Sequence, residues 1–281
     1  MHLNWKLDPK GREMVRASVT RSYKSPEITQ LMGRYALNNN YPDEKQTNDE
    51  LNPDRVGNPM LKPELATGID IAYERYMSGG GMFSLGFFHR SINDLIRNVT
   101  TLDAPTAIVP VPRYVMRPTN ISRATTSGIE MELKGRAGEL LPSLFDAKTA
   151  LNLRTALSVY RSRVKALSGP DARLDQQPPW TGSVGFDYRF SGLPLTVGST
   201  LVYTPGYATQ QTERQTLDQW RSRQLDLFAQ WTFSPKTSLR FSANNLAPLD
   251  NTRLTSVTSG DYTYVARGSR TQLGLALDMK L

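Results

Sequence analysis

An alternation of apolar and polar residues with a period of two recurs in about eleven segments of this sequence and predicts an all-β protein, an antiparallel transmembrane β-barrel. The clearest segment is residues 271–281, where Leu273, Leu275 and Leu277 alternate with small or polar residues. About 9 to 11 residues let a tilted strand cross a bilayer. Short turns and long polar connections also alternate along the chain, as they do at the two rims of a membrane barrel.

The composition agrees with a barrel and excludes other classes. The chain has 281 residues, of which 38% are hydrophobic, and its mean hydropathy is -0.45. Barrel strands give only every second residue to lipid, so they need no run of about 18 apolar residues, and none occurs. Cysteine is absent, which excludes disulfides and thiolate metal sites. The net charge of +8 is spread over the chain without a basic cluster, so we expect no nucleic-acid partner.

Five hairpins and a final strand account for the eleven segments. Each hairpin joins two alternating segments across a turn rich in Gly, Pro, Asp or Ser, which favour tight turns. The five turns are expected at residues 8–11, 78–81, 141–143, 191–194 and 234–237. The apolar positions of the paired segments run from Leu3 to Leu7 and Val15 to Tyr23, Ile69 to Tyr73 and Phe83 to Phe87, Ile129 to Leu133 and Leu151 to Val159, Val184 to Phe190 and Leu195 to Tyr203, and Leu225 to Phe233 and Leu239 to Ala243.

The remaining connections are long and polar, at residues 24–63, 97–120, 164–178 and 246–260. Outer-membrane barrels have short periplasmic turns and long extracellular loops, so these connections are expected at the extracellular rim and the carboxyl terminus at the periplasmic rim. Aromatic residues near the segment ends are expected in the interfacial girdles. They are Trp5, Tyr23, Tyr73, Tyr203, Trp231 and Phe233.

Several motifs, in order along nearly the whole chain, resemble the C-terminal half of the β-barrel of TonB-dependent outer-membrane receptors. The most specific is Asn-Pro-Met-Leu-Lys-Pro-Glu at residues 58–64, preceded by an aromatic and Pro-containing segment at residues 22–31. Residues 120–133 resemble a Gly-hydrophobic-Glu strand of the family. Residues 241–250 resemble its Asn-Leu segment, and residues 267–281 resemble its last strand, although Leu281 stands where Phe is usual.

The resemblance implies one domain over residues 1–281, half of a barrel of about 22 strands. It implies an outer-membrane location and lipid around the wall. The plug domain and the first half of the wall are expected to be missing from this chain, so that the TonB complex would act only through a plug outside it. In the family the intact receptor imports a scarce ligand, commonly a ferric siderophore, and the chain would supply wall and loops.

Arginine and tyrosine in the long connections are the candidate ligand-binding residues. Arg offers planar, bidentate hydrogen bonding and stacking to an anionic chelate. The candidates are Arg97, Arg113, Tyr114, Arg117 and Arg123, with Tyr207 and Arg214 as further candidates in the next long strand extension. The alternative interpretation is that these are solvated loop charges, or contacts to phosphates of the outer leaflet.

No enzymatic site, metal site or cofactor is expected. The chain has two histidines, His2 and His89, in different hairpins. A lipase-like arrangement of His89 with Ser91 and Asn93 is a minor alternative, because nothing fixes the distance between nucleophile and base. Residues 79–81 are three glycines without a following helix, so they predict a turn and no phosphate loop. Two other barrels, a porin and an autotransporter translocator, and a soluble β-sandwich remain alternative classes.

Overall fold

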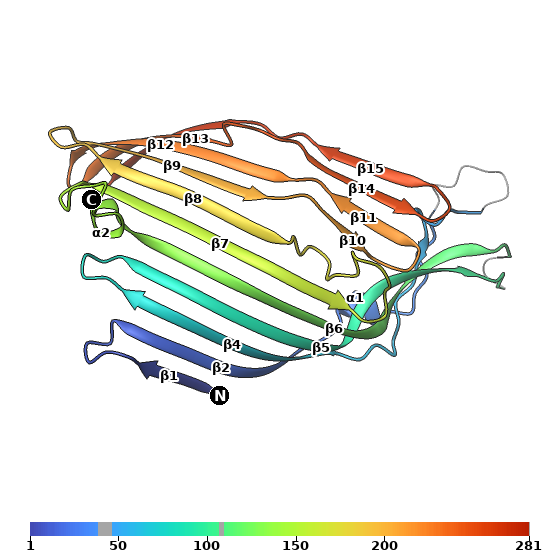
Figure 1. Ribbon diagram of the computed structural model, residues 1–281. Coiled ribbons are helices and arrows are strands. Elements are labelled where there is room, and N and C mark those ends of the chain that lie inside the picture. The colour runs from blue at the N-terminus through green and yellow to red at the C-terminus, as the bar shows by residue number, and fades with distance from the viewer. Residues whose placement is uncertain (39–46, 107–109, 281) are drawn as a thin grey trace.

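The computed structural model describes residues 1–38, 47–106 and 110–280. Eleven strands of this part form one curved antiparallel sheet in which spatial order follows chain order (Figure 1). This confirms the predicted all-β wall. The strands are β1 (His2–Lys6), β2 (Glu13–Lys24), β4 (Glu64–Tyr76), β5 (Met82–Asp103), β6 (Arg113–Arg136), β7 (Leu151–Val164), β8 (Trp180–Arg189), β9 (Leu195–Thr204), β12 (Ser222–Ser234), β13 (Thr237–Asn244) and β16 (Gln272–Met279).

All five predicted hairpins are confirmed, as β1–β2, β4–β5, β6–β7, β8–β9 and β12–β13. The glycines at residues 79–81 form the β4–β5 turn, as predicted. The Met77 amide donates to the carbonyl of Gly81 at 2.8 Å, and Gly80 has a φ of 91°. Glycine adopts this left-handed conformation without steric cost. The β6–β7 connection also contains a short helix, α2 (Ala137–Leu140).

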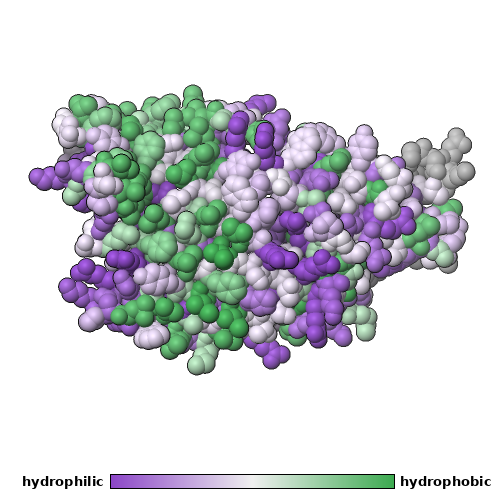
Figure 2. Space-filling model, in the orientation of Figure 1, coloured by the Kyte–Doolittle hydropathy of each residue, from purple (hydrophilic) through white to green (hydrophobic). Residues whose placement is uncertain are grey.

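One face of the sheet is apolar and exposed. The register places Ala17, Ile71, Phe87, Ile129 and Val159 in one row across five neighbouring strands. Ile71 is 46% exposed, Phe87 46% and Ile129 52%. A β-sandwich would bury such a row against a second sheet, so the sandwich alternative is not favoured. Figure 2 shows this face, with hydrophobic side chains gathered over the left part of the sheet and hydrophilic ones toward the long-loop end.

The opposite face is polar and carries ion pairs between neighbouring strands. Its row beside the apolar one contains Arg16, Ala72, Gly86, Glu130 and Ser158. Because successive side chains of a strand point to opposite faces, arginines at alternate positions meet carboxylates here. The pairs are Arg16–Glu74 at 2.9 Å, Arg90–Asp70 at 2.7 Å and Arg154–Asp187 at 2.9 Å.

Glycine lets an aromatic ring lie flat on the polar face. Phe88 of β5 is directly opposite Gly128 of β6, and a Cβ added to Gly128 would lie 2.5 Å from the Phe88 ring. The Arg90 guanidinium covers the ring, 4.9 Å from its centroid. Phe228, Gly198 and Arg240 repeat this arrangement on β12, β9 and β13, with 4.0 Å from guanidinium to ring centroid. Both phenylalanines therefore pack against the sheet, although they point away from the apolar face.

Aromatic side chains lie near both ends of the apolar face. Near the short turns, Tyr73 packs against Phe83 with 6.3 Å between ring centroids, and Trp231 and Phe233 are exposed at the end of β12. Near the long loops, Trp180 packs against Tyr203 with 5.4 Å between centroids. These two levels match the interfacial girdles expected for a membrane barrel.

The sheet has two rims, as predicted. Figure 1 shows the five short turns at one end and the long connections at the other. Met279 of β16 pairs with Thr237 beside the β12–β13 turn, so the last strand ends at the short-turn rim. Leu281 lies outside the described residues. None of the helices in the described part is long and apolar enough to span a membrane.

Two expected loops are wrong in part, because they contain strands. β5 continues to Asp103 and β6 begins at Arg113, inside the predicted loop at residues 97–120. The predicted loop at residues 246–260 contains β14, which joins a separate four-stranded sheet. That sheet comprises β10 (Tyr207–Gln210), β11 (Gln215–Gln219), β14 (Asn251–Val257) and β15 (Tyr262–Arg267). In these stretches polar residues occupy both faces of the strand, so the sequence has no apolar alternation to reveal it.

The two faces can be distinguished by placing one arginine at adjacent positions of β6. Ile129→Arg puts a charge on the apolar face and is expected to lower the free energy of unfolding by about 2 to 4 kcal/mol. Glu130→Arg, on the polar face, is expected to change it by about 0.5 kcal/mol or less. Urea-induced unfolding in phospholipid vesicles measures both. Equal costs would contradict the assignment of faces.

Candidate functional site

The long connection between β2 and β4 forms one side of the candidate site. It contains the short helix α1 (Ile28–Leu31) and β3 (Asp54–Arg55), which pairs in parallel with Val115 and Met116 of β6. β5 occupies the opposite edge of β6 at these residues, so β3 lies on the edge that β7 leaves free. The connection therefore crosses the β5–β6 hairpin to reach this edge.

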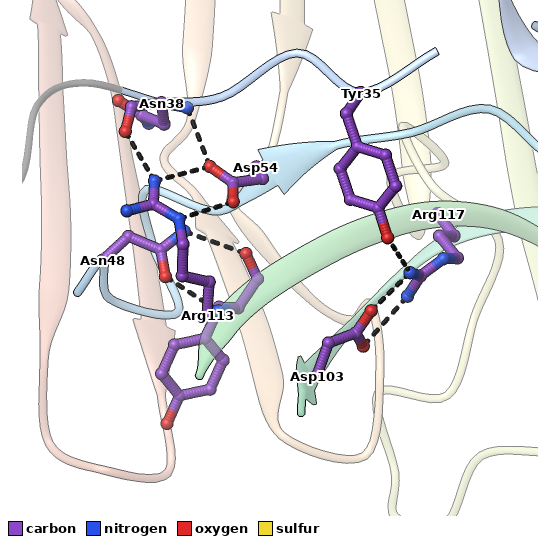
Figure 3. A network of polar contacts seen from close by, with 8 residues as sticks. Tyr35, Asn38, Asn48, Asp54, Asp103, Arg113 and Arg117 are labelled. Atoms are coloured by element: carbon purple, nitrogen blue, oxygen red, sulfur yellow. Dashed lines mark hydrogen bonds and ion pairs between the residues drawn. The ribbon is translucent and has the colours of Figure 1, made fainter. Parts of the chain in front are cut away.

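A buried ion pair holds this crossing in place (Figure 3). The guanidinium of Arg113 donates two hydrogen bonds to Asp54, both at 2.7 Å, and their side chains are 6% and 1% exposed. Arg113 also donates to the carbonyl of Asn38, whose amide donates to Asp54 at 2.8 Å. The side chain of Asn48 accepts a hydrogen bond from the Tyr114 amide at 2.7 Å and donates one to the Tyr114 carbonyl at 2.9 Å. Arg113 thus binds other segments of the chain itself, whereas the sequence made it a candidate for ligand contact.

A second, more exposed ion pair joins the two strands of the hairpin. Arg117 of β6 donates to both carboxylate oxygens of Asp103 on β5, and to the Tyr35 hydroxyl at 2.9 Å. Its side chain is 32% exposed. Hydrogen bonding from Arg117 holds the pKa of Asp103 below its usual value. For Asp54, burial opposes ionisation, but hydrogen bonds from Arg113 and the Asn38 amide outweigh it and lower the pKa.

Arg97 connects β5 to two other segments. Its guanidinium donates to the carbonyls of Gln210 and Gln211 at 2.9 and 3.0 Å, and to that of Arg173 at 2.7 Å. Asp175 lies 3.1 Å away. Burial lowers the pKa of Arg97 and raises that of Asp175, and the charge of each partly offsets the shift of the other. Nearby apolar packing of Leu95, Ala124, Val164, Leu167 and Ala172 supports the same region.

The other sequence-predicted residues lie in different surroundings. Burial and the nearby Asp175 raise the pKa of Tyr207, which places it beside the Arg97 cluster. Arg214 lies 3.2 Å from Glu50 of the β2–β4 connection and is 55% exposed. Arg123 is exposed on β6, one residue from the buried Ala124. The structure therefore places Arg113, Tyr114 and Arg117 on one stretch of β6, places both Arg97 and Tyr207 near Asp175, and leaves Arg123 apart.

Sequence reasoning missed the acidic partners and one groove. Asp54, Asp103, Asp175 and Glu50 lie in the expected long connections, where nothing in the sequence distinguishes them from other acidic residues. An open groove lies between the β2–β4 connection and the β5–β6 hairpin, and its cationic and aromatic lining residues are Arg34, Tyr35 and Arg55. Arg34 and Arg55 are exposed and form no ion pair within the described ranges. The same ranges contain no group of three or more His, Asp or Glu that could hold a metal ion.

Removing Arg113 should release the crossing segment. Arg113→Met leaves the Asp54 charge buried and unpaired, which is expected to cost about 3 to 5 kcal/mol. Arg117→Met is the matched control, because its pair is partly solvated and should cost about 1 kcal/mol or less. Hydrogen exchange of the amides of residues 54–57 reports the release. Equal exchange in the two variants would show that Arg113 does not hold the segment.

Low pH should weaken the attachment of the β2–β4 connection to the β5–β6 hairpin. The pKa values of Asp54 and Asp103 are lowered in the folded protein, so their stabilisation is complete above the ordinary pKa of about 3.9. It is lost as the pH falls through the lowered values. Protease resistance of the β2–β4 connection, followed from pH 7 to about pH 2, is expected to persist at pH 5 and to decline below about pH 4. Asp103→Asn should remove part of this pH dependence.

Comparisons with known proteins agree with this architecture. The family described as TonB dependent receptor-like, beta-barrel matches residues 2–246. A ferric enterobactin receptor of Pseudomonas aeruginosa, solved with enterobactin, shares 15% identity at a TM-score of 0.67, over 99% of this chain and 40% of its own. The FrpB iron transporter from Neisseria meningitidis shares 14% at 0.60, over 99% and 37% of the two chains. The siderophore receptor PirA from Acinetobacter baumannii shares 15% at 0.60, over 89% and 36%.

No curated protein sequence matches the chain. The chain spans about 40% of the length of the solved receptors that it resembles. The family match covers most of the chain and favours the receptor hypothesis over the porin and autotransporter alternatives. The chain therefore belongs to the family of TonB-dependent receptor-like β-barrels, whose members are outer-membrane proteins.

Proposed function

We propose that this chain forms barrel wall and extracellular loops of an outer-membrane receptor that binds and imports a ferric siderophore. The observation that carries the proposal is the braced assembly at the long-loop end. There, the β2–β4 connection is fixed to the β5–β6 hairpin by the Arg113–Asp54 pair, and among the described residues Arg34 and Arg55 form no ion pair beside it. Free guanidinium groups in a rigid setting suit an anionic chelate.

The proposal assigns roles to six of the seven predicted residues, all except Arg123. Arg97, Arg113 and Arg117 are occupied by carboxylates, so they would position the loops. Tyr114 and Arg214 are partly or fully exposed, and Tyr207 is partly buried, so these three stay candidates for ligand contact together with the groove residues Arg34, Tyr35 and Arg55. The ligand class is supported by the receptors named above, which share the fold. Energy would come from the TonB complex through a plug that is not part of the described sheet.

Uptake of radioactive iron by the source bacterium tests the function. Cells with the gene disrupted are expected to lose uptake from one class among catecholate, hydroxamate and citrate chelates. Arg34→Gln with Arg55→Gln should raise the apparent KM for that chelate about tenfold or more, at unchanged protein level, since each lost charged hydrogen bond costs about 1.5 kcal/mol or more. Lys10→Gln with Lys236→Gln, an equal charge change at exposed positions of the short-turn rim, is the control. Unchanged uptake of every chelate after disruption would refute the proposal.

A further inference from the structure

Four basic side chains cluster on the outward face of β6 and β7. Arg161 and Arg163 follow Val159 at alternate positions of β7, and the register pairs them with Ser127 and Thr125 of β6. The same alternation continues into Lys165, whose amide donates to the carbonyl of Arg123 at 2.9 Å. Arg123, Arg161, Arg163 and Lys165 are all exposed. We refer to these four residues as the outward basic cluster.

The register shows that this cluster lies on the lipid side of the wall. Val159, two residues before Arg161, belongs to the apolar row with Ile129 and Phe87. Trp180, directly opposite Val159 on β8, stacks with Tyr203 at the level expected for an interfacial girdle. The cluster therefore begins where the apolar surface ends, on the long-loop side. Headgroups of the outer leaflet occupy this level around a membrane barrel.

Among the described residues the outward basic cluster lacks acidic partners, unlike three arginines of the polar face. Arg16, Arg90 and Arg154 each pair with a carboxylate of a neighbouring strand. Within the described residues, none of the four outward residues forms an ion pair, and Arg163 donates one hydrogen bond to the carbonyl of Gly169 at 3.3 Å. Hydroxyl and imidazole groups of Thr125, Ser127 and His89 continue the same two rows. This chemistry fits an anion that carries several oxygen acceptors.

The spacing suits more than one phosphate group. Alternate residues of a strand lie about 7 Å apart and neighbouring strands about 5 Å apart. The four cations thus occupy a patch of about 5 by 14 Å, directly above the apolar surface of Ile129 and Val159. A lipid seated there would have its phosphates on the cations and its acyl chains on that surface. A soluble anion would use only the first of these two contacts.

We propose that the outward basic cluster is a binding site for a phosphorylated membrane lipid of the outer leaflet. Arg supplies planar, bidentate donors to phosphate oxygens, and its charge costs little to keep at the headgroup level. The site is independent of ligand uptake, because it lies on the outside of the wall. Arg123, a candidate ligand contact in the sequence, belongs to this site in the proposal.

Lipid A, a glycolipid with two phosphate groups, is the test probe. The protein is purified from outer membranes in dodecyl maltoside, and native mass spectrometry follows the binding of lipid A and of the same lipid without phosphates. Arg161→Gln with Arg163→Gln is expected to weaken lipid A binding about 10- to 30-fold and to leave the phosphate-free lipid unaffected. Arg253→Gln with Arg267→Gln, exposed arginines of the four-stranded sheet, is the matched control and should bind as the unaltered protein does.

Three results would overturn the proposal. One is equal lipid A affinity of the Arg161/Arg163 variant and the unaltered protein. The second is equal affinity for the lipid with and without phosphates. The third is displacement of lipid A by equimolar inorganic phosphate, which would indicate a free-anion site. Hydrogen exchange of β6 and β7 amides checks that the variant is folded, and Arg123→Gln with Lys165→Gln provides a second pair if it is not.

Discussion

Lateral pairing of backbone amides and carbonyls is the constraint on which the whole wall depends. Hydrocarbon offers no hydrogen bonds, so each strand must satisfy its backbone with its two neighbours. That requirement fixes straight, in-register strands and sends alternate side chains to opposite faces. The apolar row through Ile71 and Ile129 and the charged row through Arg16 and Glu130 are two consequences of one pattern. Even the lumen-side phenylalanines obey it, because Gly128 and Gly198 make room for their rings.

Beyond the membrane the wall is stabilised differently. Strands β5 and β6 are far longer than a bilayer requires, and their outer halves are covered in part by other segments of the chain. Charged hydrogen bonds replace lipid contact there. Arg113 and Arg97 each gather carbonyls and a carboxylate from distant segments, and both are buried. An arginine with five donors can join three segments at once, which a hydrophobic side chain of similar size cannot do.

The arginines of this protein therefore fall into three chemical settings. Arg16, Arg90 and Arg154 on the polar face of the wall neutralise carboxylates across strands, and Arg97 and Arg113 hold loops against the β5–β6 hairpin. Arg123, Arg161 and Arg163 on the outward face have no acidic partner among the described residues, and we assign them to lipid phosphates. The net charge of +8 is thus distributed by location. The basic residues are spread evenly along the sequence, but strand pairing gathers them at particular places of the fold.

The sequence by itself determined the spanning part of this protein. Alternation located the five hairpins, the short turns and the polarity of the rims, because inside a bilayer hydropathy and pairing carry the same information. Tertiary structure alone decided what lies beyond the membrane. Contacts between residues far apart in the chain determine three features: the extension of β5 and β6, the four-stranded sheet, and the partners of Arg97 and Arg113. Such contacts leave no local periodicity, since polar residues occupy both faces of those strands.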